Sequence, residues 1–332
     1  MPGKPKSQSR ARKTISRRKS SSRKKTDIYK VYVIRFILAV LSLVLVFVVF
    51  KVYLAWQNRL WDGNSRITVV VATPDPTVYS YNPRSQTLIT FPIPKETQLT
   101  SAMGYGEWMA GSLWALDDQE KKGGRLFASS VQKSLGMPID GWMNRQGKGF
   151  FQNSSFSFLP SMIKALPNAK LGTNLTFFDR LNLAVAVGRV STLNRREINL
   201  VSSGAIKESF LADGEKGFLV IPEKTVLVLD ALRDDKVFEE AKTIKITNAT
   251  GKSGVGAEVS RTVSILGIRV VAIDTGQENL KEVCVVRERG KTLKSRAAKQ
   301  IIGLFGCTSD SKDPAGPASL EIILGEDFVK YF

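Results

Sequence analysis

Residues 243–274 read TIKITNATGKSGVGAEVSRTVSILGIRVVAID, and this stretch sets the structural class of the C-terminal part of the chain. Thr243–Thr247 and Ile268–Asp274 are predicted strands, and Ser253–Leu266 between them is a predicted helix. Further along, Glu282–Val286 and Ser319–Leu324 are predicted strands that enclose a helix over Thr292–Leu304. The order β-α-β-β-α-β predicts a small α/β domain over residues 242–330.

The turn inside this stretch contains Gly251, Lys252 and Ser253, the last three residues of a phosphate-binding P-loop. That motif requires a glycine five residues before Gly251, where this chain has Ile246. We therefore interpret the glycines as a tight turn between strand and helix that lets the helix pack closely, rather than as a nucleotide site.

Upstream, residues 66–240 are predicted to form a second extracytoplasmic domain with mixed strands and helices. The strand Ile67–Ala72 is a β-branched apolar run, and the turn Asn82–Ser85 joins two strands into a hairpin. Predicted helices, a loop and an extended piece follow, in this order: helix Leu126–Leu135, loop Gly141–Ser155, helix Phe156–Leu166, helix Phe177–Arg189 and extended Thr225–Leu229.

Residues 36–50 read FILAVLSLVLVFVVF and contain no charged residue. Apolar residues continue on both sides over residues 31–56, which is long enough for one transmembrane helix. The basic flank lies on the N-terminal side, so the positive-inside rule places residues 1–30 in the cytoplasm and the body outside the cell. A cleaved signal peptide is the alternative, but the apolar segment is too long and no A-x-A site follows it.

The chain has 49 Lys and Arg against 30 Asp and Glu, a formal net charge of +19. Residues 1–30 contribute most of this excess, because their many basic residues are opposed only by Asp27. A tail of this composition is predicted to be disordered and to contact anionic lipid. Nucleic-acid binding by this tail is the alternative, which we do not expect because membrane topology already explains the charge.

The chain contains no histidine, which excludes His-based general catalysis and most transition-metal sites. Its chemistry would have to use carboxylates, Lys, Arg, hydroxyls or a hard cation such as Mg²⁺. The two cysteines, Cys284 and Cys307, both follow the apolar segment. Outside the cytoplasm they could form a disulfide, and two unpaired thiols are the alternative.

Two parts of the chain resemble known families. NATGKSGVGAEVS at 248–260, LGIRVVAID at 266–274 and SLEIILGEDF at 319–328 resemble the LytR C-terminal domain of bacterial cell-envelope proteins. The N-terminal part of the body resembles the LytR-CpsA-Psr (LCP) catalytic domain, through VYSYNPRSQTLITFPIPKET at 78–97, SAMGYGE at 101–107, SLGMPIDGWM at 134–143 and TNLTFFDRLNLA at 173–184.

The LCP resemblance implies transfer of a glycopolymer from a polyprenyl-pyrophosphate carrier to the cell wall, with arginines on the pyrophosphate and carboxylates on Mg²⁺. Asp75 matches an acidic residue of this family, whereas its Arg-Asp pair is replaced by Lys95–Glu96. Lysine keeps the charge but loses the bidentate guanidinium. No Asp or Glu lies between Met143 and Leu171, where the family has an Arg- and Asp-rich stretch.

The sequence therefore predicts an α/β (α+β) protein with one transmembrane helix, an LCP-like mixed sheet with helices, and a small C-terminal domain. We expect a non-catalytic envelope protein that binds a wall glycopolymer, a polyprenyl phosphate lipid or a partner enzyme. The alternative is a glycopolymer phosphotransferase that uses Asp75, Lys95, Glu96 and Mg²⁺.

Overall fold

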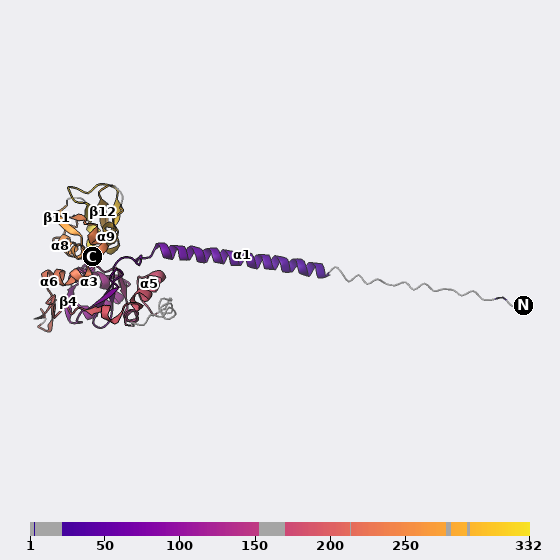
Figure 1. Ribbon diagram of the computed structural model, residues 1–332, viewed down its shortest axis with the longest axis horizontal. Coiled ribbons are helices and arrows are strands. Elements are labelled where there is room, and N and C mark those ends of the chain that lie inside the picture. Colours follow the sequence, from indigo (N-terminus) through magenta and orange to yellow (C-terminus); the bar gives the residue numbers. More distant parts are fainter. Residues whose placement is uncertain (1–2, 4–21, 153–169, 213, 277–279, 291–292) are drawn as a thin grey trace. The chain divides into compact units, whose positions relative to one another are not determined.

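The computed structural model describes residues 3, 22–152, 170–212, 214–276, 280–290 and 293–332 (Figure 1). The chain divides into two units, Met1–Gln57 and Asn58–Phe332. We describe each unit by itself.

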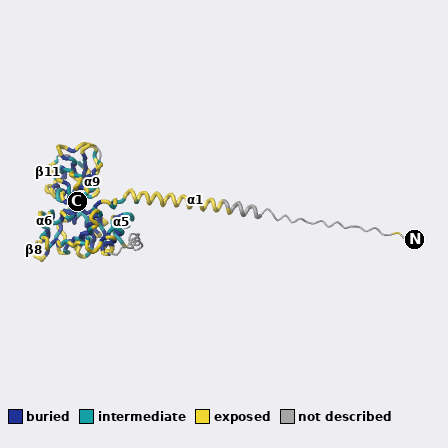
Figure 2. The backbone as a smooth tube through the Cα atoms, viewed as in Figure 1, coloured by how far each residue is buried: buried dark blue, intermediate teal, exposed yellow. Residues whose placement is uncertain are grey.

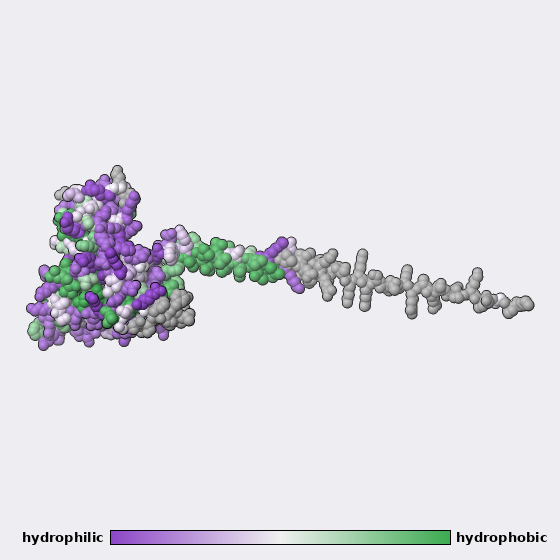
Figure 3. All heavy atoms as spheres, viewed as in Figure 1, coloured by the Kyte–Doolittle hydropathy of each residue, from purple (hydrophilic) through white to green (hydrophobic). Residues whose placement is uncertain are grey.

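The first unit contains one long helix, α1 (Ser22–Gln57). Its segment Tyr32–Gln57 is long and apolar enough to cross a membrane, and the side chains along it are exposed (Figure 2). The apolar surface of this segment is continuous in the space-filling view (Figure 3). The helix begins at Ser22, so it includes the end of the tail that the sequence predicted to be disordered, because the basic residues before the apolar run are also good helix formers. Most of that tail lies outside the described residues.

The first sheet of the second unit is mixed, with the strand order β6-β1-β2-β3-β7. The hairpin predicted from the Asn82–Ser85 turn is confirmed, because β2 and β3 pair antiparallel. β1 pairs antiparallel with β2 and parallel with β6, and β3 pairs parallel with β7. The strands are β1 (Ile67–Val71), β2 (Thr77–Asn82), β3 (Thr87–Pro92), β6 (Gly141–Met143) and β7 (Arg195–Glu197).

Both faces of this sheet are covered, so every residue of β1 is buried. Val70 belongs to a hydrophobic cluster that includes residues of α3 (Arg125–Leu135). Val69, on the opposite face, belongs to a cluster that includes residues of α5 (Phe177–Gly188). The continuous β-branched run in β1 is therefore the consequence of a strand with no solvent-facing side.

A second sheet has the strand order β5-β4-β9-β8. Its strands are β4 (Thr97–Thr100), β5 (Glu107–Met109), β8 (Ile206–Phe210) and β9 (Lys216–Val220). The remaining helices before the C-terminal part are α2 (Leu113–Gln119), α6 (Pro222–Val228) and α7 (Asp235–Glu239), with short 3-10 turns η1 (Ala102–Gly104), η2 (Ala110–Ser112), η3 (Arg145–Phe150), η4 (Thr192–Asn194) and η5 (Leu229–Leu232).

The third sheet is also mixed, with the strand order β11-β10-β14-β12-β13. The predicted β-α-β-β-α-β order is confirmed, with the short strand β13 added before the last strand. The helices share one hydrophobic cluster with the sheet, and η6 (Glu326–Lys330) follows it. The elements are β10 (Thr243–Asn248), α8 (Val255–Ile265), β11 (Arg269–Thr275), β12 (Cys284–Glu288), α9 (Arg296–Phe305), β13 (Thr308–Asp310) and β14 (Leu320–Leu324).

The glycine-rich turn before α8 has the structural role that its sequence predicts. Gly254 caps the N-terminus of α8 at a φ of 86°, a backbone conformation that favours glycine. A Cβ added at Gly256 would lie 2.8 Å from the Ile273 side chain, so this glycine allows α8 to pack closely on β11. The domain boundary near Lys242 stays a prediction.

Two predicted segments differ from the structure. The predicted loop 141–155 contains β6 and η3, because residues 141–143 pair with β1 and complete the edge of the first sheet. The predicted extended piece 225–229 lies mainly in α6, which starts with Pro222 at its first position, where proline favours a helix. The helix predicted over 156–166 lies outside the described residues.

Candidate functional site

The three candidate residues from the sequence, Asp75, Lys95 and Glu96, lie together on the surface. Asp75 follows β1, and its Oδ1 accepts a hydrogen bond of 3.0 Å from the backbone N–H of Lys95. Lys95 Nζ lies 3.5 Å from Glu96 Oε1, and the two side chains are 59% and 47% exposed. An ion pair exposed to this extent contributes little and leaves both groups solvated.

These residues lie outside the cavities that the structure describes. Three cavities are described in the structure, and none of them is lined by Asp75, Lys95 or Glu96. Within the described ranges, no group of three Asp, Glu, His or Cys is placed to hold a metal ion.

A cavity of about 520 Å³ opens elsewhere in the body, between α3 and β6 on one side and the end of α9 on the other. Its lining contains two cations, Lys122 and Arg125, and one acid, Asp140. The aromatic residues Trp142 and Tyr331 line it too. Sequence reasoning missed this cavity because its walls come from segments far apart in the chain.

Asp140 connects this cavity to a buried polar network. Its Oδ2 accepts a hydrogen bond of 2.7 Å from the Thr68 N–H. The pKa of Asp140 is raised to about 7, mainly because the carboxyl is buried and in smaller part because Asp234 is near. The Thr68 hydrogen bond and the charges of Arg66 and Arg296 act in the opposite direction.

Asp234 is the centre of the same network and is 2% exposed. Its Oδ2 accepts hydrogen bonds from the Arg66 N–H at 3.1 Å and from Gln300 Nε2 at 3.4 Å. Its Oδ1 accepts the Lys236 N–H at 2.9 Å and so caps α7. One carboxylate therefore joins the residue before β1 to the start of α7 and to α9.

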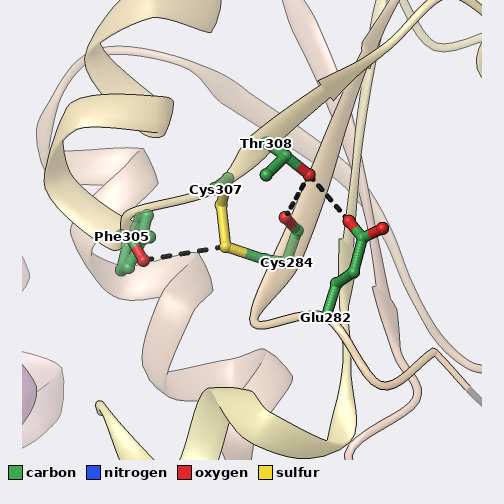
Figure 4. The surroundings of a disulfide bond; sticks show 5 residues. All are labelled: Glu282, Cys284, Phe305, Cys307 and Thr308. Carbon is green, nitrogen blue, oxygen red and sulfur yellow. Dashed lines mark hydrogen bonds between the residues drawn. A yellow bond between two sulfur atoms is a disulfide. The ribbon is translucent and has the colours of Figure 1, made fainter.

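The two cysteines are joined in a disulfide between the start of β12 and the segment after α9 (Figure 4). Thr308 Oγ1 donates a hydrogen bond of 2.8 Å to Glu282 Oε2 beside the bridge. Val283 and Gly306, which adjoin the two cysteines, line the cavity. The disulfide therefore fixes one wall of the cavity.

We expect the double substitution Cys284→Ala/Cys307→Ala to lower the free energy of unfolding by about 3 kcal/mol, because it reopens a loop with a sequence separation of 23 residues. Denaturant unfolding followed by tryptophan fluorescence measures this change. The unsubstituted protein in reductant should match the double variant without reductant. An unfolding midpoint that reductant leaves unchanged would contradict a stabilising bridge.

Residues 241–328 match the family model described as LytR cell envelope-related transcriptional attenuator, which confirms the resemblance of the C-terminal part. No match to the chain was found among curated proteins.

Three solved structures of two bacterial proteins, TagV and TagT, are similar to this chain. The crystal structure of Bacillus subtilis TagV has 11% identity and a TM-score of 0.41, over 51% of this chain and 96% of that one. TagT bound to LIIa-WTA has 12% identity and a TM-score of 0.38, over 51% and 90%. The LytR-CPS2A-psr family protein YwtF (TagT) with bound octaprenyl pyrophosphate lipid has 12% identity and a TM-score of 0.37, over 52% and 91%.

Proposed function

We propose that this chain, whose C-terminal part matches the LytR C-terminal family model, is a membrane-anchored protein of the bacterial cell envelope. α1 would span the membrane with residues 1–30 in the cytoplasm, as the basic flank supports. The body Asn58–Phe332 would then lie outside the cell, where a disulfide is stable.

In this proposal the body is a non-catalytic binding protein for a wall glycopolymer, a polyprenyl carrier or a partner enzyme. The exposure of the candidate catalytic residues is the observation that carries it. Lys95 and Glu96 are about half exposed and pair with each other, and Asp75 is bonded to a backbone N–H. Phosphoryl transfer depends on positioned, desolvated charges, which this open arrangement does not supply.

We expect the full-length protein in detergent, given polyprenyl pyrophosphate and Mg²⁺, to release phosphate no faster than a protein-free sample. The reason is that Lys95 is a solvated point charge without the bidentate geometry of arginine. Phosphate release measures the reaction directly. If release exceeds the background and is abolished by Lys95→Ala but not by the control Lys207→Ala, the protein is a transferase and the non-catalytic proposal is wrong.

A further inference from the structure

The cavity beside α3 has the size and the wall chemistry of a ligand site. Its volume of about 520 Å³ lies within the range of roughly 300–1,000 Å³ that is common for small-molecule pockets. Residues of α3 and β6 form one wall, and Gly303–Gly306 with Val283 form the other. A hydrogen bond of 3.1 Å from Lys133 Nζ of α3 to the backbone oxygen of Phe332 joins α3 to another part of the lining.

Gln132 gives this cavity a buried donor without a partner. Its side chain lines the cavity and the residue is 3% exposed. The Ile139 N–H donates to Gln132 Oε1, which fixes the orientation of the amide. Gln132 Nε2 is left without a hydrogen-bond partner among the described residues. Because an unmade hydrogen bond of a buried donor is costly, Gln132 Nε2 favours an acceptor oxygen inside the cavity, from solvent or from a bound molecule.

The entrance adds positive charge and an aromatic surface. Lys122 and Arg125 are exposed and line the cavity at the start of α3. A Cβ at Gly124 would lie 2.3 Å from the Trp142 ring, so this glycine lets the ring pack directly on the chain. Tyr331, which is 44% exposed, contributes a second ring to the lining. Partly exposed rings offer flat apolar surfaces, and cations bind anionic oxygens.

Asp140 is the acidic side chain in the lining, and its negative charge is compensated by neighbouring groups. Its Oδ2 is bonded to the Thr68 N–H, and Arg66 and Arg296 lie near enough to offset its charge. Phe332 also lines the cavity, and its backbone oxygen accepts a hydrogen bond of 3.1 Å from Lys133 Nζ. The exposed side chains of Lys122 and Arg125 therefore favour an anionic ligand, and Gln132 Nε2 supplies a buried neutral donor.

We propose that this cavity binds an anionic saccharide segment, with Gln132 Nε2 donating to a sugar or phosphate oxygen, Lys122 and Arg125 meeting the negative charge, and Trp142 and Tyr331 contacting the sugar rings. The inference rests on the proposed binding function and adds the site and the ligand class. The site is separate from Asp75, Lys95 and Glu96, which do not line it.

The test uses the full-length protein in detergent and a glucosylated poly(glycerol phosphate) oligomer, with a neutral glucose oligomer of similar length for comparison. Gln132→Glu keeps the acceptor for the Ile139 N–H but removes the donor. Lys122→Glu/Arg125→Glu reverses two exposed charges at the cavity. The matched control, Lys207→Glu/Lys224→Glu, makes the same charge change at exposed lysines of another cavity.

We expect the unsubstituted protein and the control to bind the anionic oligomer equally, and each cavity variant to bind it at least about tenfold more weakly, as titration calorimetry would show. Binding that all variants retain would overturn the location and leave the proposed binding function intact. Equal binding of the neutral oligomer would overturn the anionic class. If the unsubstituted protein binds neither oligomer, the cavity inference is wrong, and the proposed function would depend on a lipid carrier or partner enzyme.

Discussion

Replacing Asp179 by alanine should lower the free energy of unfolding of the body by about 4 kcal/mol. Asp179 is fully buried, and its carboxylate accepts four hydrogen bonds. Two of them come from Thr176, whose own side chain accepts the Asp179 N–H and so completes a capping box at the start of α5. The other two come from the backbone N–H groups of Leu60 and Trp61, at 3.1 and 3.0 Å.

The expected loss of about 4 kcal/mol is the sum of a lost helix cap and of backbone N–H groups left without a partner. Loss of a cap costs about 1 kcal/mol, and each buried N–H left without a partner costs about 1–3 kcal/mol. Denaturant unfolding of the full-length protein in detergent measures the change, with Trp61 as a buried fluorescent reporter beside the site. Asp118→Ala is the control because Asp118 is exposed. Equal midpoints for the two variants would show that the Asp179 bonds contribute nothing to stability.

Asp179 also shows how far sequence reasoning reaches. The helix that follows Thr176 was predicted, and the structure confirms it over Phe177–Gly188. The bonds to Leu60 and Trp61 join residues 119 and 118 positions apart, so no local pattern could predict them. Local propensity fixes where a helix begins, whereas the segment that docks on its cap depends on the tertiary fold.

The neighbouring residues Asp117 and Asp118 of α2 are a second example in which local geometry explains only part of what the structure shows. Neighbouring residues on a helix point about 100° apart, so the carboxylates of the two residues diverge. Asp117 is buried and accepts the N–H groups of Gly124 and Phe127, whereas Asp118 is exposed. Helix geometry therefore predicted the divergence of the pair but not which partner would be buried.

The cavity could not be predicted in the same way. Gln132 occupies a polar position of a helix that the sequence predicted correctly, and nothing in its spacing distinguishes it from a solvated glutamine. Its significance comes from Ile139, whose backbone N–H donates to Gln132 Oε1, and from the α9 segment that forms the opposite wall. Strands β4, β5 and β8 were missed because they are only three to five residues long and carry polar residues, such as Gln98, Glu107 and Lys207, at several positions.

Asp140→Asn should make the body more stable than the unsubstituted protein at pH 8. The pKa of the folded carboxyl is about 7, above its ordinary value of 3.8, mainly because burial disfavours the charged form. The folded state therefore binds more protons than the unfolded state between these values, and its stability falls as the pH rises from about 4 to about 7. With 1.36 kcal/mol for each pKa unit, this loss amounts to at most about 4 kcal/mol.

The asparagine keeps an acceptor for the Thr68 N–H and cannot ionise, so the stability of the variant should not fall across this range. The difference in unfolding free energy between variant and unsubstituted protein should grow from pH 4 to pH 7 and stay constant above it. Carboxyls with lowered pKa values, such as Asp62 and Glu288, are present in both proteins, so their contribution cancels in this difference. Unfolding curves measured at pH 4, 5.5, 7 and 8, values chosen to bracket roughly that window, test the sign directly. Parallel stability profiles for the two proteins would mean that Asp140 is solvated and ionised like an ordinary surface acid.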